Sequence, residues 1–298
     1  MTRLGRVPAF PTLRHAIDAA AAALAEAGVG SPRADAELLA AHVTGTDRGR
    51  LAFTDIGPGF RERYDRLVAQ RTKRVPLQHL TGTAAFGPVS VHVGPGVFIP
   101  RPETEALLEW AVAQELSRRP VIVDLCTGSG ALALALLTTR PDARVIAVDD
   151  SDDALAYARR NTAGTPVELV QADVTAPGLL AALDGQVDLV VANPPYIPDG
   201  SALEPEVAEH DPPHALFGGP DGMAVIDRIV ELAARLLRDG GRCAVEHDDT
   251  TSARTVEAFT RTARFVDVTA RHDLTGRPRF VTATRERLTS LLPEGERE

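Results

Sequence analysis

Hydrophobic residues recur at helical spacing between residues 13 and 74, which predicts a series of short amphipathic helices. The first predicted helix has its apolar residues three or four positions apart: Leu13, Ile17, Ala20, Leu24 and Ala27. Gly28 ends it, and Ser31 followed by Pro32 is typical of the start of a second helix, which extends to Gly45. A third helix is predicted over residues 60–74. It is expected to end there because Pro76 disfavours helix in the residue before it. Residues 1–80 are therefore expected to form a small helical bundle.

The pattern changes to alternation after this bundle. Residues 86–93 alternate around Gly87-Pro88, which predicts a β-hairpin. Pro100 and Pro102 interrupt regular structure soon afterwards, so residues 81–101 are expected to link two domains. A helix is expected to begin at Pro102, since proline is favoured in the first turn of a helix.

From Pro120 onward, short apolar runs alternate with helical patterns. Strands are predicted at residues 121–125, 144–148, 167–170, 187–191, 242–245, 265–270 and 279–283. Helices are predicted at residues 131–137, 152–160, 223–237 and 252–262. This alternation indicates an α/β fold with a doubly wound, seven-stranded sheet within a domain of residues 102–298. Such sheets form a ligand crevice at the carboxyl ends of their strands.

Composition and charge narrow the classes of protein that fit. The chain has 298 residues, 44% of them hydrophobic, without a run of 18 uncharged apolar residues, so no membrane span is expected. Two cysteines and no secretory signal pattern favour a cytoplasmic protein without disulfides. Residues 1–80 carry 12 Arg and Lys against 8 Asp and Glu, whereas the rest carries 20 against 33. The acidic remainder argues against stable nucleic-acid binding; the basic part fits either an acidic partner or ordinary solvated helix faces.

The first chemical motif lies where the predicted strand 121–125 turns into a helix. It reads Cys126-Thr127-Gly128-Ser129-Gly130, and its glycines let the backbone approach a ligand closely. Asp149 ends the next strand, where a carboxylate can accept hydrogen bonds from ribose hydroxyls. Together they indicate an adenosine-containing cofactor. Because the spacing also fits the dinucleotide fingerprint, both a nicotinamide dinucleotide and S-adenosylmethionine stay open, beside a tight turn that binds nothing.

The second motif, Asn193-Pro194-Pro195-Tyr196, follows the predicted strand 187–191. The prolines fix a rigid turn and lack N–H groups, so the Pro194 carbonyl is free to accept a hydrogen bond from a ligand. Asn193 adds a side-chain carbonyl, and Tyr196 adds an aromatic face and a hydroxyl. Two acceptors suit a planar nitrogen with two N–H bonds, such as an exocyclic amine or a primary amide. The motif therefore favours methyl transfer to nitrogen; the alternative is a turn that only ends a strand.

These motifs resemble those of the release factor glutamine N5-methyltransferases, which use S-adenosylmethionine to methylate the glutamine side chain in the Gly-Gly-Gln loop of bacterial peptide chain release factors. The matching segments follow the family's order from residue 76 to the end of the chain: Pro76-Leu77-Gln78-His79-Leu80-x-Gly82, Phe98 to Glu105, Asp124 to Gly130, Asn193 to Tyr196, Ala215 to Gly222 and Asp273-Leu274-x-Gly276-Arg277. The resemblance implies a Rossmann-like methyltransferase sheet.

The resemblance also assigns cofactor-binding residues. Cys126, Thr127, Gly128, Ser129 and Gly130 would line the methionine part of S-adenosylmethionine. Asp149 would hold the ribose, Asp173 would lie near the adenine amine, and Asn193 would contact both cofactor and substrate. No metal is implied. Two departures stand in this region: Cys126 occupies a position where the family often has glycine, and Val174 replaces an aromatic residue sometimes found beside the adenine.

The substrate glutamine would be held by Asn193, Pro194, Pro195 and Tyr196, with Phe98 packed around its amide; Asn193, Pro194 and Tyr196 are the expected catalytic residues. The sequence offers no obvious strong base, so catalysis is expected from alignment and fixed dipoles. His247 and the Asp248-Asp249 pair follow Glu246 where the family usually has a different loop, and no role is assigned to them. The implied partners are release factors 1 and 2, docked by the helical domain of a monomeric enzyme.

Three other functions remain to be weighed against this one. An N6-adenine nucleic-acid methyltransferase uses the same type of diproline turn, but it needs a basic target surface that the acidic remainder does not offer. A nicotinamide-dependent oxidoreductase leaves Asn193–Tyr196 unexplained. A non-enzymatic adaptor with a vestigial cofactor fold predicts that replacing Asn193 has no biochemical effect.

Overall fold

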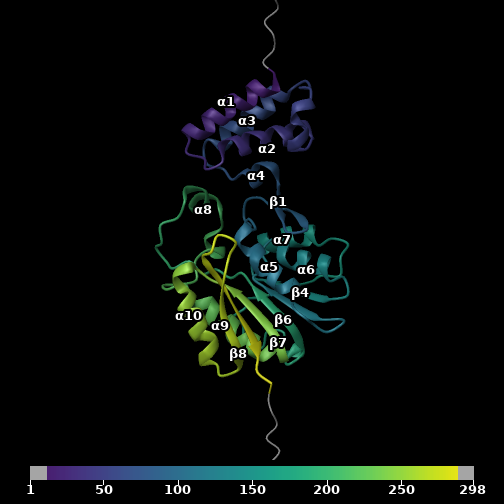
Figure 1. Cartoon of the computed structure of the whole chain (residues 1–298), viewed down its shortest axis with the longest axis vertical. Coiled ribbons are helices and arrows are strands. Elements are labelled where there is room, and N and C mark those ends of the chain that lie inside the picture. The colour runs from purple at the N-terminus through teal and green to yellow at the C-terminus, as the bar shows by residue number, and fades with distance from the viewer. Residues whose placement is uncertain (1–11, 288–298) are drawn as a thin grey trace, which may run out of the picture. The chain divides into compact units, whose positions relative to one another are not determined.

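The computed structural model describes residues 12–287, which divide into two compact units (Figure 1). The first unit contains the chain up to Thr83 together with Glu204–His210. The second contains Ala84–Leu203 and the residues from Asp211 onward. The chain therefore passes between the units three times, because a short segment from its second half folds with the first unit. None of the helices in residues 12–287 is long and apolar enough to span a bilayer.

The first unit is helical, with α1 (Leu13–Glu26), α2 (Pro32–Thr44), η1 (Arg48–Phe53), α3 (Phe60–Arg71), α4 (Leu77–Thr81) and α8 (Pro205–His210). Its core contains Leu24, Leu39 and Tyr64, whose hydroxyl donates a hydrogen bond of 2.9 Å to the Ala36 carbonyl. The third predicted helix is confirmed but ends earlier than residue 74, because the chain turns after Arg71 and Arg74 adopts a φ of +65°.

A buried arginine joins α8 to the other helices of this unit. The Arg71 side chain is 6% exposed, and its Nε donates to Asp35 at 2.7 Å. Its Nη2 donates to Glu206 at 2.9 Å, and Glu206 also accepts from Arg74 at 2.9 Å. Because Glu206 lies on α8, these ion pairs explain why Glu204–His210 folds with the helices of the N-terminal region.

The second unit begins with the predicted hairpin, formed by β1 (Thr83–Phe86) and β2 (Val89–His92). Gly87 makes its turn at a φ of +49°, where a Cβ would stand 2.6 Å from Leu108 Cδ2. Pro102 opens η2 (Pro102–Thr104), which leads directly into α5 (Glu105–Val112). The helix expected at Pro102 is therefore present, with a 3₁₀ first turn.

The seven strands form one sheet in the order β5-β4-β3-β6-β7-β9-β8. Their bounds are β3 (Val121–Leu125), β4 (Arg144–Asp149), β5 (Glu168–Gln171), β6 (Val187–Ala192), β7 (Leu237–Glu246), β8 (Phe265–His272) and β9 (Pro278–Arg285). The first five strands in the order run parallel, whereas β9 is antiparallel to both β7 and β8. The order reverses at β3, so the doubly wound α/β fold predicted from the alternation is confirmed.

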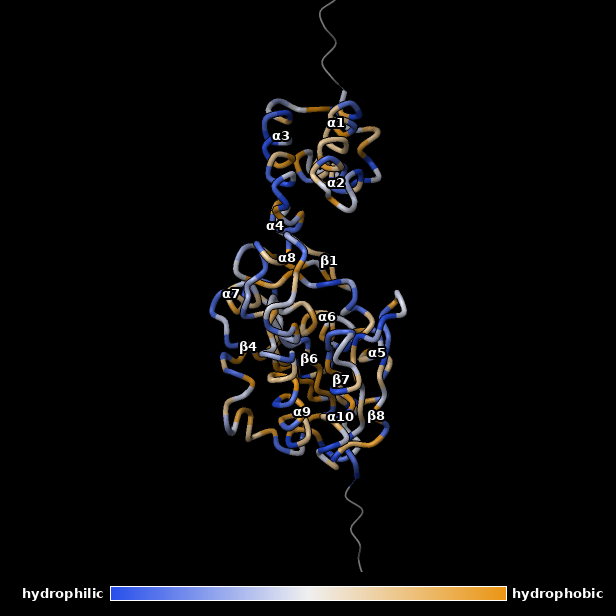
Figure 2. Tube along the Cα trace, turned by 90° about the vertical axis from the view of Figure 1, so that its left-hand side faces the viewer, coloured by the Kyte–Doolittle hydropathy of each residue, from blue (hydrophilic) through white to orange (hydrophobic). Residues whose placement is uncertain are grey.

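Helices cover both faces of this sheet. The hairpin, α5, α6 (Ala131–Thr139) and α7 (Asp152–Asn161) share a core with one face. The helices α9 (Ala224–Leu236) and α10 (Ser252–Arg261) share a core with the other. Neighbouring residues such as Ile122 and Val123 point into opposite cores, so the strands are apolar on both sides. Figure 2 accordingly colours the central strand β6 largely as hydrophobic.

Candidate active site

Strand register brings the two chemical motifs to the same level of the sheet. Leu125, the last residue of β3, pairs with Val148 of β4 on one side and with Ala192 of β6 on the other. Cys126 follows Leu125, Asp149 follows Val148 and Asn193 follows Ala192. These three residues therefore lie at the same level. Because parallel strands share one carboxyl edge, the glycine turn, the acidic residue and the diproline corner leave three adjacent strands together.

The glycine turn is held by short hydrogen bonds at its base. Thr127 donates its hydroxyl to Asp124 Oδ2 at 2.5 Å and its backbone N–H to the Val148 carbonyl at 3.0 Å. Cys126 adopts a φ of +59°, in the left-handed region that favours glycine. Asp124 is 1% exposed, and burial raises the pKa of its carboxyl to about 7 despite the Thr127 hydrogen bond.

Asp149 connects this turn to the start of α7. Its Oδ2 accepts a hydrogen bond of 2.8 Å from the Gly128 N–H, and its Oδ1 accepts one of 3.0 Å from the Ser151 N–H. Burial raises the pKa of this carboxyl, and the two N–H donors oppose that rise. Each carboxylate oxygen has a second lone pair, so both can still accept a hydroxyl of a bound ribose.

Carboxylates surround the turn. Burial first, and then the charges of Asp149, Asp124, Asp150 and Asp173, raise the pKa of the Cys126 thiol well above its ordinary value. A field of this sign favours a cationic ligand and repels a pyrophosphate. The turn therefore fits the sulfonium of S-adenosylmethionine, and it disfavours the nicotinamide dinucleotide that the glycine spacing had left open.

His214 is a polar residue of this edge that the sequence analysis did not single out. Its Nε2 lies 2.7 Å from Asp150 Oδ1, and this contact raises the pKa of the imidazole. It belongs to η4 (Pro213–Ala215), and the negative charges of Asp149 and Asp173 also raise its pKa. Asp173 itself is exposed after β5, with its pKa lowered by hydrogen bonds from Thr175.

The diproline corner presents its oxygens in a fixed arrangement. Asn193 Nδ2 donates to the hydroxyl of Thr104 at 3.2 Å, which commits the amide nitrogen and leaves the side-chain oxygen as an acceptor. Thr104 is 4% exposed and lies at the end of η2, so the turn that opens at Pro102, just after the predicted linker, positions the asparagine. Pro194 is buried, and Pro195 and Tyr196 are partly exposed.

Tyr196 is anchored by a buried carboxyl. Its hydroxyl donates to Glu246 Oε1 at 2.9 Å, and Glu246 is 1% exposed at the end of β7. Burial raises the pKa of Glu246 to about 7, although the hydroxyls of Thr104 and Tyr196 and the charge of Arg279 favour the ionised form. Glu246 therefore connects the two residues, Thr104 and Tyr196, that flank the asparagine.

Two glycines let a second segment pass against the diproline corner. Ile197 donates to the Leu216 carbonyl at 2.8 Å, and Gly218 donates back to the Ile197 carbonyl at 2.9 Å. A Cβ on Gly218 would lie 2.6 Å from the Pro195 oxygen, and one on Gly222 would lie 2.2 Å from the Tyr196 oxygen. This close backbone contact gives a physical reason for the glycines in the segment 215–222.

Two other residues considered in the sequence have contacts of their own. Phe98 packs beneath Arg101, whose guanidinium carbon is 4.8 Å from the ring centre, so its place beside a substrate amide stays a prediction. His247 is fully buried, and burial lowers the pKa of its imidazole. Its Nδ1 lies 2.8 Å from the Asp248 carbonyl, as expected of a structural histidine. No cluster of His, Cys, Asp and Glu within residues 12–287 could hold a metal ion.

Comparison with known proteins covers both units. Residues 15–82 match the family model described as PrmC N-terminal domain, and residues 90–210 match the model described as methyltransferase small domain. A crystal structure of a methyltransferase from Pyrococcus furiosus, 16% identical, aligns with a TM-score of 0.50 over 66% of this chain and 89% of that chain. That likeness supports the fold of the second unit.

Relatives found by sequence have a much higher identity to this chain than that structure has. The release factor glutamine methyltransferase of Mycolicibacterium smegmatis is 73% identical over 274 residues, which is 92% of this chain and 98% of the relative. The protein of the same name from Mycobacterium tuberculosis is 68% identical over 279 residues, 92% of each chain, and that from Deinococcus radiodurans is 43% identical over 92% of this chain and 98% of its own. With both family models matched in order and relatives of this identity spanning nearly its whole length, the chain belongs to the release factor glutamine methyltransferase family.

Proposed function

We propose that this protein transfers the methyl group of S-adenosylmethionine to the side-chain amide nitrogen of the glutamine in the Gly-Gly-Gln motif of peptide chain release factors. The observation that carries this function is the level placement of Cys126, Asp149 and Asn193 on adjacent strands. This placement supports a site for a cationic adenosine cofactor beside two oxygen acceptors suited to a carboxamide. Family membership names the same reaction.

The cofactor would lie across the carboxyl edge of the sheet. Residues 126–130 would follow its methionine part, Asp149 would accept from the ribose hydroxyls, and Asp173 would approach the adenine amine. When bound, S-adenosylmethionine supplies an electrophilic methyl group on a positively charged sulfur. The carboxylates around Cys126 would stabilise that charge and so favour binding of the methylated cofactor over its product, which lacks the sulfonium charge.

The substrate amide needs alignment because its nitrogen lone pair is delocalised into the carbonyl. The side-chain oxygen of Asn193 and the carbonyl of Pro194 would each accept one of its two N–H bonds and aim the nitrogen at the methyl group. These oxygens also stabilise the positive charge that grows on nitrogen during attack. Alignment of this kind can supply on the order of 7–11 kcal/mol. Tyr196 and Phe98 would exclude water around the amide, and the proton would leave to water after transfer.

The helical domain of residues 1–80 would dock the release factor, since a glutamine loop alone offers little contact area. Arg61, Arg63 and Arg66 on α3 are exposed, and Arg61 and Arg66 form ion pairs of 3.0 Å with Asp65 and Glu62. Reversing the charge of Arg61, Arg63 and Arg66 should raise KM for a full release factor and leave KM for a loop peptide unchanged. Equal effects on both substrates would contradict docking by this domain.

Within this proposal the enzyme is a cytoplasmic monomer that acts on release factors 1 and 2 and does not bind nucleic acid stably. The test is incubation with methyl-labelled S-adenosylmethionine and purified release factors, with the loop glutamine intact or replaced. Label should appear on protein and require that glutamine. Asn193→Ala should lower kcat by about 100- to 1000-fold, comparable to removing one preorganised polar group from an active site. Label on DNA or RNA, or full activity of Asn193→Ala, would overturn the proposal.

A further inference from the structure

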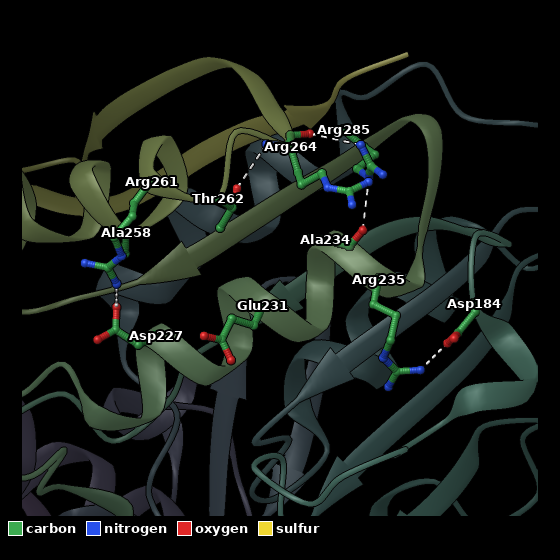
Figure 3. Close-up of a pocket in the computed structure, with 10 residues that line it drawn as sticks. All are labelled: Asp184, Asp227, Glu231, Ala234, Arg235, Ala258, Arg261, Thr262, Arg264 and Arg285. Atoms are coloured by element: carbon green, nitrogen blue, oxygen red, sulfur yellow. Dashed lines mark hydrogen bonds and ion pairs between the residues drawn. The ribbon is translucent and has the colours of Figure 1, made fainter. Parts of the chain in front are cut away.

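An open cleft of about 630 Å³ lies at the opposite edge of the sheet from the candidate active site (Figure 3). It is lined by most of α9, from Asp227 to Arg235, and by the end of α10, the residue before β8 and the end of β9. These ends all lie at the amino edge of the parallel strands, because β9 runs antiparallel to β7. All of its lining residues belong to the second unit.

Charged side chains dominate the cleft, and its carboxylates already have cationic partners. Each of the three forms an ion pair with an arginine: Asp184 with Arg235, Asp227 with Arg261 at 2.9 Å, and Glu231 with Arg228 at 3.0 Å. Two further arginines, Arg264 and Arg285, line the same cleft. The cleft therefore holds more positive charge than its own carboxylates neutralise.

Arg285 is 7% exposed, yet it has no ion pair with a carboxylate in residues 12–287. Its Nε donates to the Ala234 carbonyl at 3.0 Å, and its Nη1 donates to the carbonyls of Arg264 and Glu286, both at 3.2 Å. Carbonyl oxygens satisfy N–H groups but carry no net charge. A buried guanidinium held in this way keeps its full positive charge at the wall of the cleft.

The side chain of Arg264 adds a second positive charge at the same place. Figure 3 shows it running from the backbone toward the guanidinium of Arg285. Arg264 is exposed, and its side chain forms no ion pair with a described residue. Two like charges that converge without a carboxylate repel each other, and this repulsion is relieved when an anion binds between them.

We propose that Arg264 and Arg285 form a binding site for the phosphate group of a small molecule. A phosphate monoester carries about −1.5 to −2 charges at pH 7 and three acceptor oxygens, so it can neutralise both guanidiniums, whereas a carboxylate carries only one charge. Arg264 can donate to two phosphate oxygens through its planar fork, and Arg285 can donate through Nη2, the nitrogen that its three carbonyl partners leave open. The ligand is inorganic phosphate or a phosphorylated metabolite, since the cleft has room for more than the anion.

The test is calorimetric titration of the full chain with inorganic phosphate and, separately, with glycerol 3-phosphate, at constant ionic strength set with sodium chloride. Saturable binding of either compound is expected, and tighter binding of one identifies the source of the phosphate group. Arg264→Gln should weaken that binding at least tenfold, while Arg285 and the backbone carbonyls of the cleft stay in place. Because Arg264 is exposed, this variant removes a charge without opening the core.

Arg159→Gln is the matched control, because it removes an exposed arginine from α7, outside the cleft. It should change the dissociation constant less than twofold. The proposal is overturned if neither compound binds saturably, or if Arg264→Gln and Arg159→Gln bind as the wild type does.

Discussion

Replacing Glu246 by glutamine should change how the stability of this enzyme depends on pH. Glu246 is 1% exposed, and burial raises the pKa of its carboxyl from 4.5 to about 7. The folded protein therefore holds a proton at this carboxyl up to a higher pH than the unfolded chain does. The stability contributed by this proton is fully present below about pH 4.5 and is lost as the pH rises through about 7.

The size of the effect follows from the two pKa values. The interval from 4.5 to about 7 corresponds to about 3 kcal/mol, at ~1.36 kcal/mol for each pH unit. The free energy of unfolding of the wild type minus that of Glu246→Gln should fall by about this amount between pH 4.5 and about pH 7. Above that pH the difference should stay constant. Glutamine keeps an oxygen that accepts the Tyr196 hydroxyl, so the variant changes the charge and little else.

Urea unfolding followed by circular dichroism, at several pH values between 4.5 and 8, measures this difference. Glu168→Gln on β5 is the control: Glu168 is half exposed and pairs with Arg144, which lowers its pKa, so this variant should keep the pH dependence of the wild type. If the wild type and Glu246→Gln gave parallel curves over the whole range, Glu246 would not be a buried carboxyl with a raised pKa, and the reasoning would be wrong.

The glycine contact, the buried arginine and the anionic turn each give a further prediction. Gly222→Ala should lower kcat/KM more than tenfold, because its Cβ would stand 2.2 Å from a backbone oxygen of the diproline corner. Gly164→Ala is the control, because Gly164 has a similar φ but lies in open space. It should lower the free energy of unfolding in urea by about 1–2 kcal/mol and keep activity. Arg71→Met should destabilise the protein by about 3–5 kcal/mol in the same assay, since it leaves Asp35 buried without its cation, and unchanged stability would contradict this. The affinity for S-adenosylmethionine, measured by calorimetry, should rise between about pH 6 and 8 as Asp124, whose pKa is about 7, ionises; an equal rise for S-adenosylhomocysteine, which lacks the sulfonium charge, would argue against an effect on that charge.

Local patterns in the sequence were sufficient for the sheet and for both chemical motifs. Each strand of the core is a short apolar run, and the motifs follow such runs directly, so their common level could be inferred from parallel pairing alone. The first part of β7 was missed, because Gly240 and Gly241 interrupt its apolar run and the pairing with β6 shifts register there. The roles proposed for individual site residues stay predictions.

The partners that hold the motifs in place could not be read from local patterns. Thr104 lies 89 positions from Asn193, and Glu246 lies 50 positions from Tyr196, so only the folded chain brings these pairs together. The same holds for Glu206, which is 135 positions from Arg71 and yet completes the buried charge network of the first unit. A periodicity argument has no access to contacts at such separations.

The return of Glu204–His210 to the helical unit sets a rule for building chimaeras within this family. Grafting only the N-terminal residues of one relative onto another would separate Arg71 and Arg74 from the glutamate with which they pair, Glu206. A graft that carries both stretches of chain keeps the donor's ion pairs intact. If the helical unit docks the release factor as proposed, an exchange of substrate preference between relatives requires a two-piece cassette, with its junctions at the three points where the chain crosses between units.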